Sequence, residues 1–126
     1  MKLSWSIQGI ADIGSVRDLD SLLDRLAEQA HGVGMIVQVT HDNGRTLSLG
    51  LGHDESVLTF FDETGASYTS VGNREREDYL SFEFGGDVSE MMGAKALPGT
   101  LARTATREFF ETGDRPGSIE WEREWA

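Results

Sequence analysis

The sequence predicts an α+β fold, an antiparallel β-meander sheet of about six to seven strands with two amphipathic helices packed on one face. Short segments of alternating apolar and polar residues, separated by polar or glycine-containing turns, predict the strands. Two segments with apolar residues at three- and four-residue intervals predict the helices. Because each helix has one apolar stripe and each strand one apolar face, two layers bury both. At 126 residues, the chain is expected to form a single domain over residues 1–126.

The N-terminal region predicts a strand followed by a helix. Apolar and polar side chains alternate over residues 3–10, which is typical of a strand. Ser15 and Asp18 have the spacing of a capping box, which predicts the first turn of a helix. We expect this helix to end near His31-Gly32, where glycine can adopt a left-handed conformation. Its buried stripe is expected to comprise Leu19, Leu22, Leu23, Leu26, Ala27 and Ala30.

In the central region, apolar residues recur at every second position, which predicts a meander of antiparallel strands. Asp42-Asn43-Gly44 is a hairpin signal, and Asp62-Glu63-Thr64-Gly65 marks a second turn. Four strands are expected over residues 35–40, 47–51, 57–61 and 67–71. A fifth meander strand is expected over residues 80–84, after a charged loop at residues 73–78, and it should end at Gly85-Gly86.

A second helix is expected before the C-terminal strand. Residues 87–96 show no clear period, and Met91-Met92 predicts a loop or a short strand that dips into the core. Pro98 fits the first turn of a helix that ends at Gly113. The buried stripe of this helix is expected to comprise Leu97, Leu101, Ala102, Ala105 and Phe109.

The last strand is expected over residues 119–125 and differs between its two faces. Trp121 and Trp125 share one face because side chains alternate along a strand. We expect Trp121 to be buried against the second helix, and Trp125 to be partly exposed and available to a partner. The carboxylates of the opposite face are Glu120, Glu122 and Glu124.

The net charge is the strongest feature of the composition. Eleven basic residues against 22 acidic ones give a formal charge of −11. A field of this size repels nucleic acid and acidic membranes and accelerates association with a basic partner. The alternative is that acidity serves solubility alone. Among the arginines, Arg103 and Arg107 lie one helical turn apart, and a surface pair with Glu111 is expected to account for them.

The residue patterns that usually carry catalysis or bind metals are sparse. The chain has no cysteine, and its three histidines form neither a His-x-His nor a His-Glu-x-x-His pattern. Gly50-Leu51-Gly52 lacks the third glycine and the lysine of phosphate-binding loops. We therefore expect no enzyme, no cofactor and no metal site. The N-terminus lacks the apolar segment of a secretory signal, so we expect a cytoplasmic protein.

Several motifs of the chain form a recognisable series: Tyr79-Leu80-Ser81-Phe82-Glu83-Phe84-Gly85-Gly86, Ser89-Glu90, Leu97-Pro98, Ala102-Arg103-x-Ala105, Glu108-Phe109-x-x-Thr112-Gly113-x-Arg115-Pro116 and Glu120-Trp121. Through these motifs the chain resembles immunity protein family one, the antidotes encoded beside polymorphic toxins in bacteria. The resemblance extends weakly to residues 47–50 and 70–72 and thus covers most of the chain from about residue 35 onward. It implies a non-enzymatic inhibitor that binds its cognate toxin and blocks the active site. Toxins beside this family include nucleic-acid deaminases and nucleases, whose basic clefts an acidic domain can occupy.

We therefore expect an immunity protein whose partner is a toxin domain with a basic active-site cleft, with neither nucleic acid nor a membrane as partner. Acidic or aromatic residues in turns and on the exposed sheet face are the candidate contacts: Asp54, Glu55, Asp62, Glu63, Glu83, Asp87, Glu90, Glu120, Glu122 and Trp125. One alternative is a small enzyme or ligand-binding domain with a pocket between sheet and helices. Another is a structural subunit of an unrelated complex.

Overall fold

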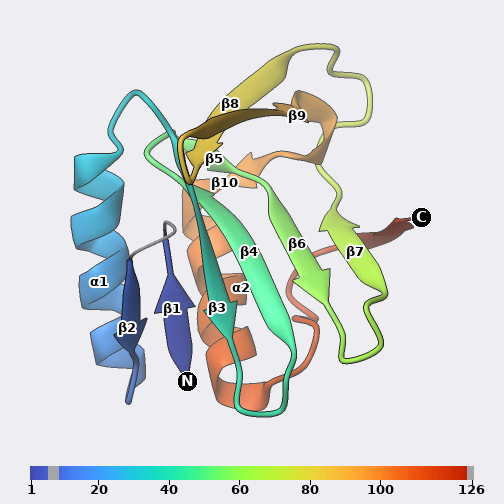
Figure 1. Ribbon diagram of the computed structural model, residues 1–126. Helices are drawn as coiled ribbons and strands as arrows, with labels where there is room; N and C mark the ends of the chain where they lie inside the picture. The colour runs from blue at the N-terminus through green and yellow to red at the C-terminus, as the bar shows by residue number, and fades with distance from the viewer. Residues whose placement is uncertain (6–8, 125–126) are drawn as a thin grey trace.

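The computed structural model describes residues 1–5 and 9–124 and confirms the α+β class (Figure 1). The large sheet has the strand order β11-β7-β6-β4-β3-β1-β2, with β8 and β9 attached beside β3. Its strands are β1 (Lys2–Ser4), β2 (Ile10–Asp12), β3 (Met35–Thr40), β4 (Thr46–Leu51), β6 (Leu58–Phe61), β7 (Ser67–Ser70), β8 (Tyr79–Phe84), β9 (Asp87–Met92) and β11 (Trp121–Glu124). A second, two-stranded sheet pairs β5 (Glu55–Ser56) with β10 (Leu97–Pro98). The helices are α1 (Val16–Gln29), α2 (Gly99–Thr112) and a 3-10 turn (Gly93–Lys95).

Both long helices pack on the same face of the sheet and form the core there. Val37 pairs with Leu49 across β3 and β4, and both side chains join the apolar cluster that contains the stripes of both helices. The Oγ of Ser15 accepts a hydrogen bond from the amide of Asp18 at 3.1 Å, which confirms the predicted start of α1. Gly113 has φ +71° and ends α2, as expected.

The N-terminal strand prediction was wrong in its extent. The structure has two short strands in place of one, and β1 pairs antiparallel with β2 so that Leu3 lies opposite Ala11. Residues 6–8 of the predicted strand lie outside the described residues. The apolar alternation does place Leu3 in the core, where it is fully buried. The alternating pattern therefore predicted the buried face but missed the reversal of the chain.

The central meander is confirmed as the antiparallel series β3-β4-β6-β7. At the first turn, the amide of Gly44 donates to the carbonyl oxygen of His41 at 3.0 Å, and Gly44 has φ +88°. At the second turn, the amide of Gly65 donates to Asp62 at 3.1 Å. Both turns need a residue with positive φ, which glycine adopts without steric cost.

The prediction that β8 continues the meander was wrong. The free edge of β7 is occupied by β11, which pairs Trp121 with Ser70, so β8 has no place there. Instead, β8 returns to β3 and pairs with it in parallel, with Glu83 opposite Met35. Figure 1 shows the β8–β9 hairpin rising from the end of the sheet beside β5 and β10.

Residues 87–92 form β9, a regular strand, and do not dip into the core as Met91-Met92 had predicted. Met91 is half-buried, whereas Met92 is 48% exposed. Gly85 and Gly86, with φ of +61° and +91°, form the two-residue turn between β8 and β9. The glycine pair therefore ends β8 as predicted and also begins a hairpin.

The two helices are joined by ion pairs in place of the expected surface pair with Glu111. Nη1 of Arg103 lies 2.8 Å from Oδ1 of Asp24, and Nε of Arg107 lies 3.0 Å from Oδ1 of Asp20. Both carboxylates belong to α1. Because Arg103 is largely buried, these contacts combine charge pairing with packing of its aliphatic stem.

The C-terminal strand begins at Trp121, later than the sequence predicted. The Trp121 ring is half-buried and lies 6.3 Å from the ring of Phe60, which in turn lies 6.0 Å from Phe109 of α2. Its Nε1 donates to the carbonyl oxygen of Pro116 at 2.7 Å. Trp125 lies outside the described residues, and its predicted exposure stays a prediction.

Gly50→Ala should destabilise the fold because a Cβ at this position would overlap the ring of Phe82. Overpacking of this kind costs about 1–3 kcal/mol in the free energy of unfolding. Chemical denaturation followed by circular dichroism measures the change. Gly117→Ala is the matched control, because a Cβ at Gly117 meets open space. Equal stability of the two variants would contradict the proposed close packing at Gly50.

Candidate functional site

The sheet face opposite the helices, called the open face below, is polar, with Ser48 and Thr69 buried and Glu122 exposed. Gln38, Ser48, Thr59, Thr69 and Glu122 are successive cross-strand partners from β3 to β11, so their side chains share this face. Partner residues on neighbouring strands lie side by side, and the row therefore crosses the sheet. This continuous row makes the open face a candidate surface for contact with another molecule.

The β8–β9 hairpin lies over one end of this open face. The fully buried ring of Phe82 packs on the bare backbone of Gly50, and its centroid lies 5.1 Å from that of His53. The Nε2 of His53 lies 2.8 Å from the carbonyl oxygen of Ser81, within hydrogen-bond distance. The amide of Glu83 donates to the carbonyl oxygen of Gly34 at 3.0 Å. These contacts fix the hairpin on the sheet.

A small hollow of about 210 Å³ separates β9 from the open face. Its lining combines polar and methionine side chains from four parts of the chain: Val57, Thr59, Thr69, Glu90, Met91, Met92, Lys95 and Glu124. Within it, Lys95 Nζ lies 2.8 Å from Glu124 Oε1, and the hydroxyl of Thr69 donates to the same carboxylate. The hydrogen bond from Lys95, with a smaller contribution from Thr69, lowers the pKa of Glu124. Glu124 is thus held as an ionised structural group.

Intramolecular ion pairs divide the candidate acids into two groups. Three of them are paired with arginines: Glu55 with Arg76 at 2.6 Å, Glu63 with Arg45 at 2.7 Å, and Glu120 with Arg74 at 3.6 Å. A carboxylate held by a neighbouring guanidinium presents less net charge to a partner. These acids therefore contribute less to an attractive surface than their number implies.

The carboxylate of Asp62 is also engaged within the protein, but by hydrogen bonds and not by an arginine. Its Oδ1 accepts hydrogen bonds from the hydroxyl and amide of Thr64, at 2.6 and 2.9 Å, and from the amide of Ala66 at 3.0 Å. The hydroxyl of Thr64 is the main cause that lowers the pKa of Asp62. Its carboxylate closes the β6–β7 turn, as aspartates commonly do.

The remaining described candidates are exposed and form no ion pair with any other described residue: Asp54, Glu83, Asp87, Glu90 and Glu122. Three of these five lie on the β8–β9 hairpin, and residues 79–92 contain no lysine, arginine or histidine. The structure thus gathers on one hairpin acids that sequence reasoning treated as separate. Gly85-Gly86 between two alternating segments was the signal that predicts such a hairpin.

An ion-pair cluster anchors the base of this hairpin. Arg76 binds Asp78 through two hydrogen bonds of 2.7 and 2.9 Å, and its Nη1 reaches Glu55 of β5. The carbonyl oxygen of Asp78 also accepts the amide of Gly93 at 2.7 Å, just after β9. The hydrogen bond from Arg76 lowers the pKa of Asp78. The cluster joins the segments that enter and leave the hairpin.

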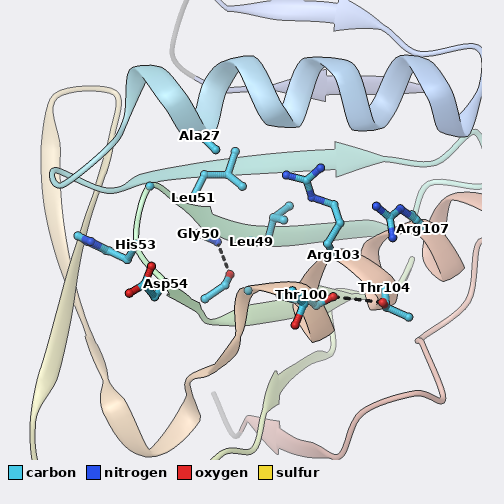
Figure 2. Close-up of a pocket in the computed structure, with 14 residues that line it drawn as sticks. Ala27, Leu49, Gly50, Leu51, His53, Asp54, Thr100, Arg103, Thr104 and Arg107 are labelled. Atoms are coloured by element: carbon cyan, nitrogen blue, oxygen red, sulfur yellow. Dashed lines mark hydrogen bonds between the residues drawn. The ribbon is translucent and has the colours of Figure 1, made fainter.

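A larger pocket of about 490 Å³ lies between β4, the end of α1 and the start of α2 (Figure 2). Arg103, Arg107, His53 and Asp54 are among its lining residues, and Figure 2 shows the arginines apart from His53 and Asp54. Both guanidinium groups are paired with α1 carboxylates, and the Oγ of Ser56 accepts the amide of Gly50 at 3.0 Å. Most polar groups of this pocket therefore already bind the protein itself. The pocket has the position that a ligand-binding alternative requires.

Two further observations concern the described part of the chain. No group of three or more histidine or acidic side chains there has an arrangement that holds a metal ion. Neither long helix has the length and the apolar character that crossing a bilayer requires, again among the described residues.

The fold and the surface define an acidic α+β protein with a hairpin that carries three exposed acids, Glu83, Asp87 and Glu90, and no basic residue. Residues 9–123 match the family model described as immunity protein Imm1, and the chain belongs to this family. This confirms the resemblance found in the sequence, and membership indicates a protein that neutralises a toxin. Among curated proteins, none matches the chain significantly.

Arg76→Gln should reduce the free energy of unfolding at neutral pH, with the loss disappearing in acid. The folded-state pKa of Asp78 is below its unfolded value, so this pairing stabilises the protein above the unfolded pKa. The stabilisation is lost as the pH falls through the folded pKa, below about pH 4. Urea denaturation at pH 7 and at about pH 3 measures the difference between variant and wild type.

Arg74→Gln is the control for this experiment, because Arg74 is more exposed and lies 3.6 Å from Glu120. We expect a smaller loss of stability at pH 7. If the difference in unfolding free energy between Arg76→Gln and wild type is the same at both pH values, the guanidinium of Arg76 does not lower the pKa of Asp78.

Proposed function

We propose that this protein is an immunity protein that binds a cognate toxin domain through an acidic surface and inhibits it without catalysis. The family match over residues 9–123 carries the proposal. The formal charge of −11 supports the acidic-surface mechanism, as do the five predicted contact acids that are exposed and form no ion pair with a described residue. The ten contact residues predicted from the sequence remain the candidate set.

The toxin that fits this surface is a nucleic-acid-acting deaminase or nuclease. Such an enzyme needs a basic cleft to hold phosphates, because phosphate contacts supply most of its non-specific affinity. An acidic domain placed over that cleft is attracted by the same field and excludes the nucleic acid. Inhibition then follows from occupancy of the cleft. The immunity protein would act in the cytoplasm, where the toxin's substrate is.

The charge also favours rapid capture of the toxin. Complementary fields raise the association rate above the value typical of neutral partners, and this increase falls with ionic strength. The dissociation rate is set mainly by packing at the contact surface. A tight, salt-tolerant complex therefore requires apolar contacts in addition to the acidic field.

The pocket beside α2 favours a second candidate function, the binding of a small ligand. Its volume of about 490 Å³ lies in the range of small-molecule sites. A thermal-shift panel of metabolites and metal ions tests this function. A ligand at 100 times its dissociation constant stabilises the folded state by about 2.7 kcal/mol.

Co-expression with the C-terminal domain encoded by the reading frame directly upstream tests the immunity function. We expect the two chains to co-purify at low and at raised salt, and the immunity protein to restore survival of cells that express the toxin domain. The association rate should fall as salt is added, because the fields of the two proteins are screened. If the two chains do not form a complex and survival is not restored, the immunity function is refuted and small-ligand binding is the remaining candidate.

A further inference from the structure

The β8–β9 hairpin carries exposed apolar side chains on the face opposite Phe82, and Glu90 and Met92 of this face also border the hollow beside β9. In the register of this hairpin, Tyr79 lies opposite Met92 and Glu83 lies opposite Val88. Side chains at every second position share a face, so these four residues lie on one side of the hairpin with Ser81 and Glu90 between them. All six side chains are exposed. We call this set the outer ladder.

The outer ladder contains most of the exposed large apolar side chains of the described chain. There are five of these, and three belong to the ladder: Tyr79 is 61% exposed, Val88 68% and Met92 48%. Of the other two, Ile10 lies on β2 and Val33 lies in the loop between α1 and β3. Isolated exposed apolar residues are common, but their concentration on one element is typical of a protein-binding surface. Tyrosine and methionine are also enriched at such surfaces.

The inner face of the same hairpin shows that this exposure does not result from loose packing. Phe82 is fully buried on the sheet, and Leu80, Phe84 and Met91 are half-buried. The hairpin is attached by the contacts of His53 and Gly34 and by the Arg76 cluster at its base. A rigid element that presents an exposed apolar face loses little conformational entropy on binding.

The charge of the hairpin identifies the kind of partner. Glu83 and Glu90 lie within the outer ladder, and Asp87 lies at its tip. None of the three forms an ion pair within the described part of the chain, and residues 79–92 carry no basic side chain. A complementary surface has an apolar depression for the ladder and basic residues around it.

We propose that the outer ladder of the β8–β9 hairpin is the surface that docks on the cognate toxin domain. Tyr79, Val88 and Met92 supply the apolar anchors, and Glu83 and Glu90 pair with basic side chains at the rim of the toxin's cleft. This inference rests on the proposed immunity function and deepens it, because it selects one of several acidic surfaces. The predicted sheet-face contacts around Glu122 are then peripheral.

The test measures binding kinetics of the full-length protein with the purified C-terminal domain encoded directly upstream. Two double variants remove the two contributions separately: V88S/M92S removes apolar anchors, and E83K/E90K reverses the charges. V88S/M92S should weaken binding about tenfold or more, mainly through faster dissociation. E83K/E90K should weaken it by a similar factor, mainly through slower association, and should reduce the dependence of the association rate on salt.

Control variants carry the same kinds of substitution outside the hairpin, so they show whether an effect depends on the position of the substituted residues. I10S removes a comparably exposed apolar side chain on β2, away from the hairpin, and E28K/E111K reverses two exposed acids on α1 and α2. We expect both controls to bind within about twofold of wild type, apart from a general reduction in association rate for E28K/E111K that follows from net charge. Circular dichroism melts of all four variants confirm that each is folded, since every substitution is at an exposed position.

The outcomes distinguish this inference from the function on which it rests. Wild type that binds and protects, with both hairpin variants bound as tightly as their controls, overturns the docking surface and leaves the immunity function standing. Wild type that neither binds nor protects overturns both. Selective weakening by the two hairpin variants supports the docking surface.

Discussion

The packing of Phe82 on the bare backbone of Gly50 is the constraint on which the candidate surface depends. The pairing of β11 with β7 closes the edge of the meander, and β8 must attach elsewhere. β8 pairs with β3 in parallel at one position, Met35 with Glu83. This is little hydrogen bonding to hold a hairpin of two strands on the sheet. The buried aromatic ring compensates for this, because a large apolar group removed from water contributes several times the net value of one hydrogen bond. A side chain at residue 50 would occupy the same space.

The acidity of this protein has two distinct uses. Some carboxylates hold the structure, as where Asp62 closes a turn, Asp20 joins the two helices and Asp78 anchors the hairpin through Arg76. Others form no ion pair within the described structure, and three of these, Glu83, Asp87 and Glu90, lie together on the β8–β9 hairpin, which has no basic residue. The net charge counts structural and unpaired carboxylates together, whereas the attraction of a basic partner depends on the unpaired ones. An acidic composition therefore indicates an attractive field without locating the surface that uses it.

The sequence predicted what local periodicity encodes and missed what distant segments decide. Both helices, their caps at Ser15 and Gly113, and the meander followed from apolar spacing and glycine positions. The attachment of β8 could not be predicted locally, because it depends on the edge that β11 occupies much later in the chain. The prediction of contact residues was limited for the same reason. Ion pairs such as Arg45 with Glu63 or Arg74 with Glu120 join segments that are distant in sequence, so the sequence did not show which acids lack an ion pair.

The alternation of the β8–β9 hairpin separates two tasks that are interleaved in the sequence. On one face, Phe82 is buried and Leu80, Phe84 and Met91 are half-buried, whereas all six residues of the outer ladder on the other face are exposed. A change at Val88 or Glu90 alters the exposed surface without altering the contact of Phe82 with the sheet. Such a hairpin can acquire a new binding preference one substitution at a time, with the cost to folding kept small at each step. Diversification of this surface is therefore nearly independent of the stability of the fold beneath it.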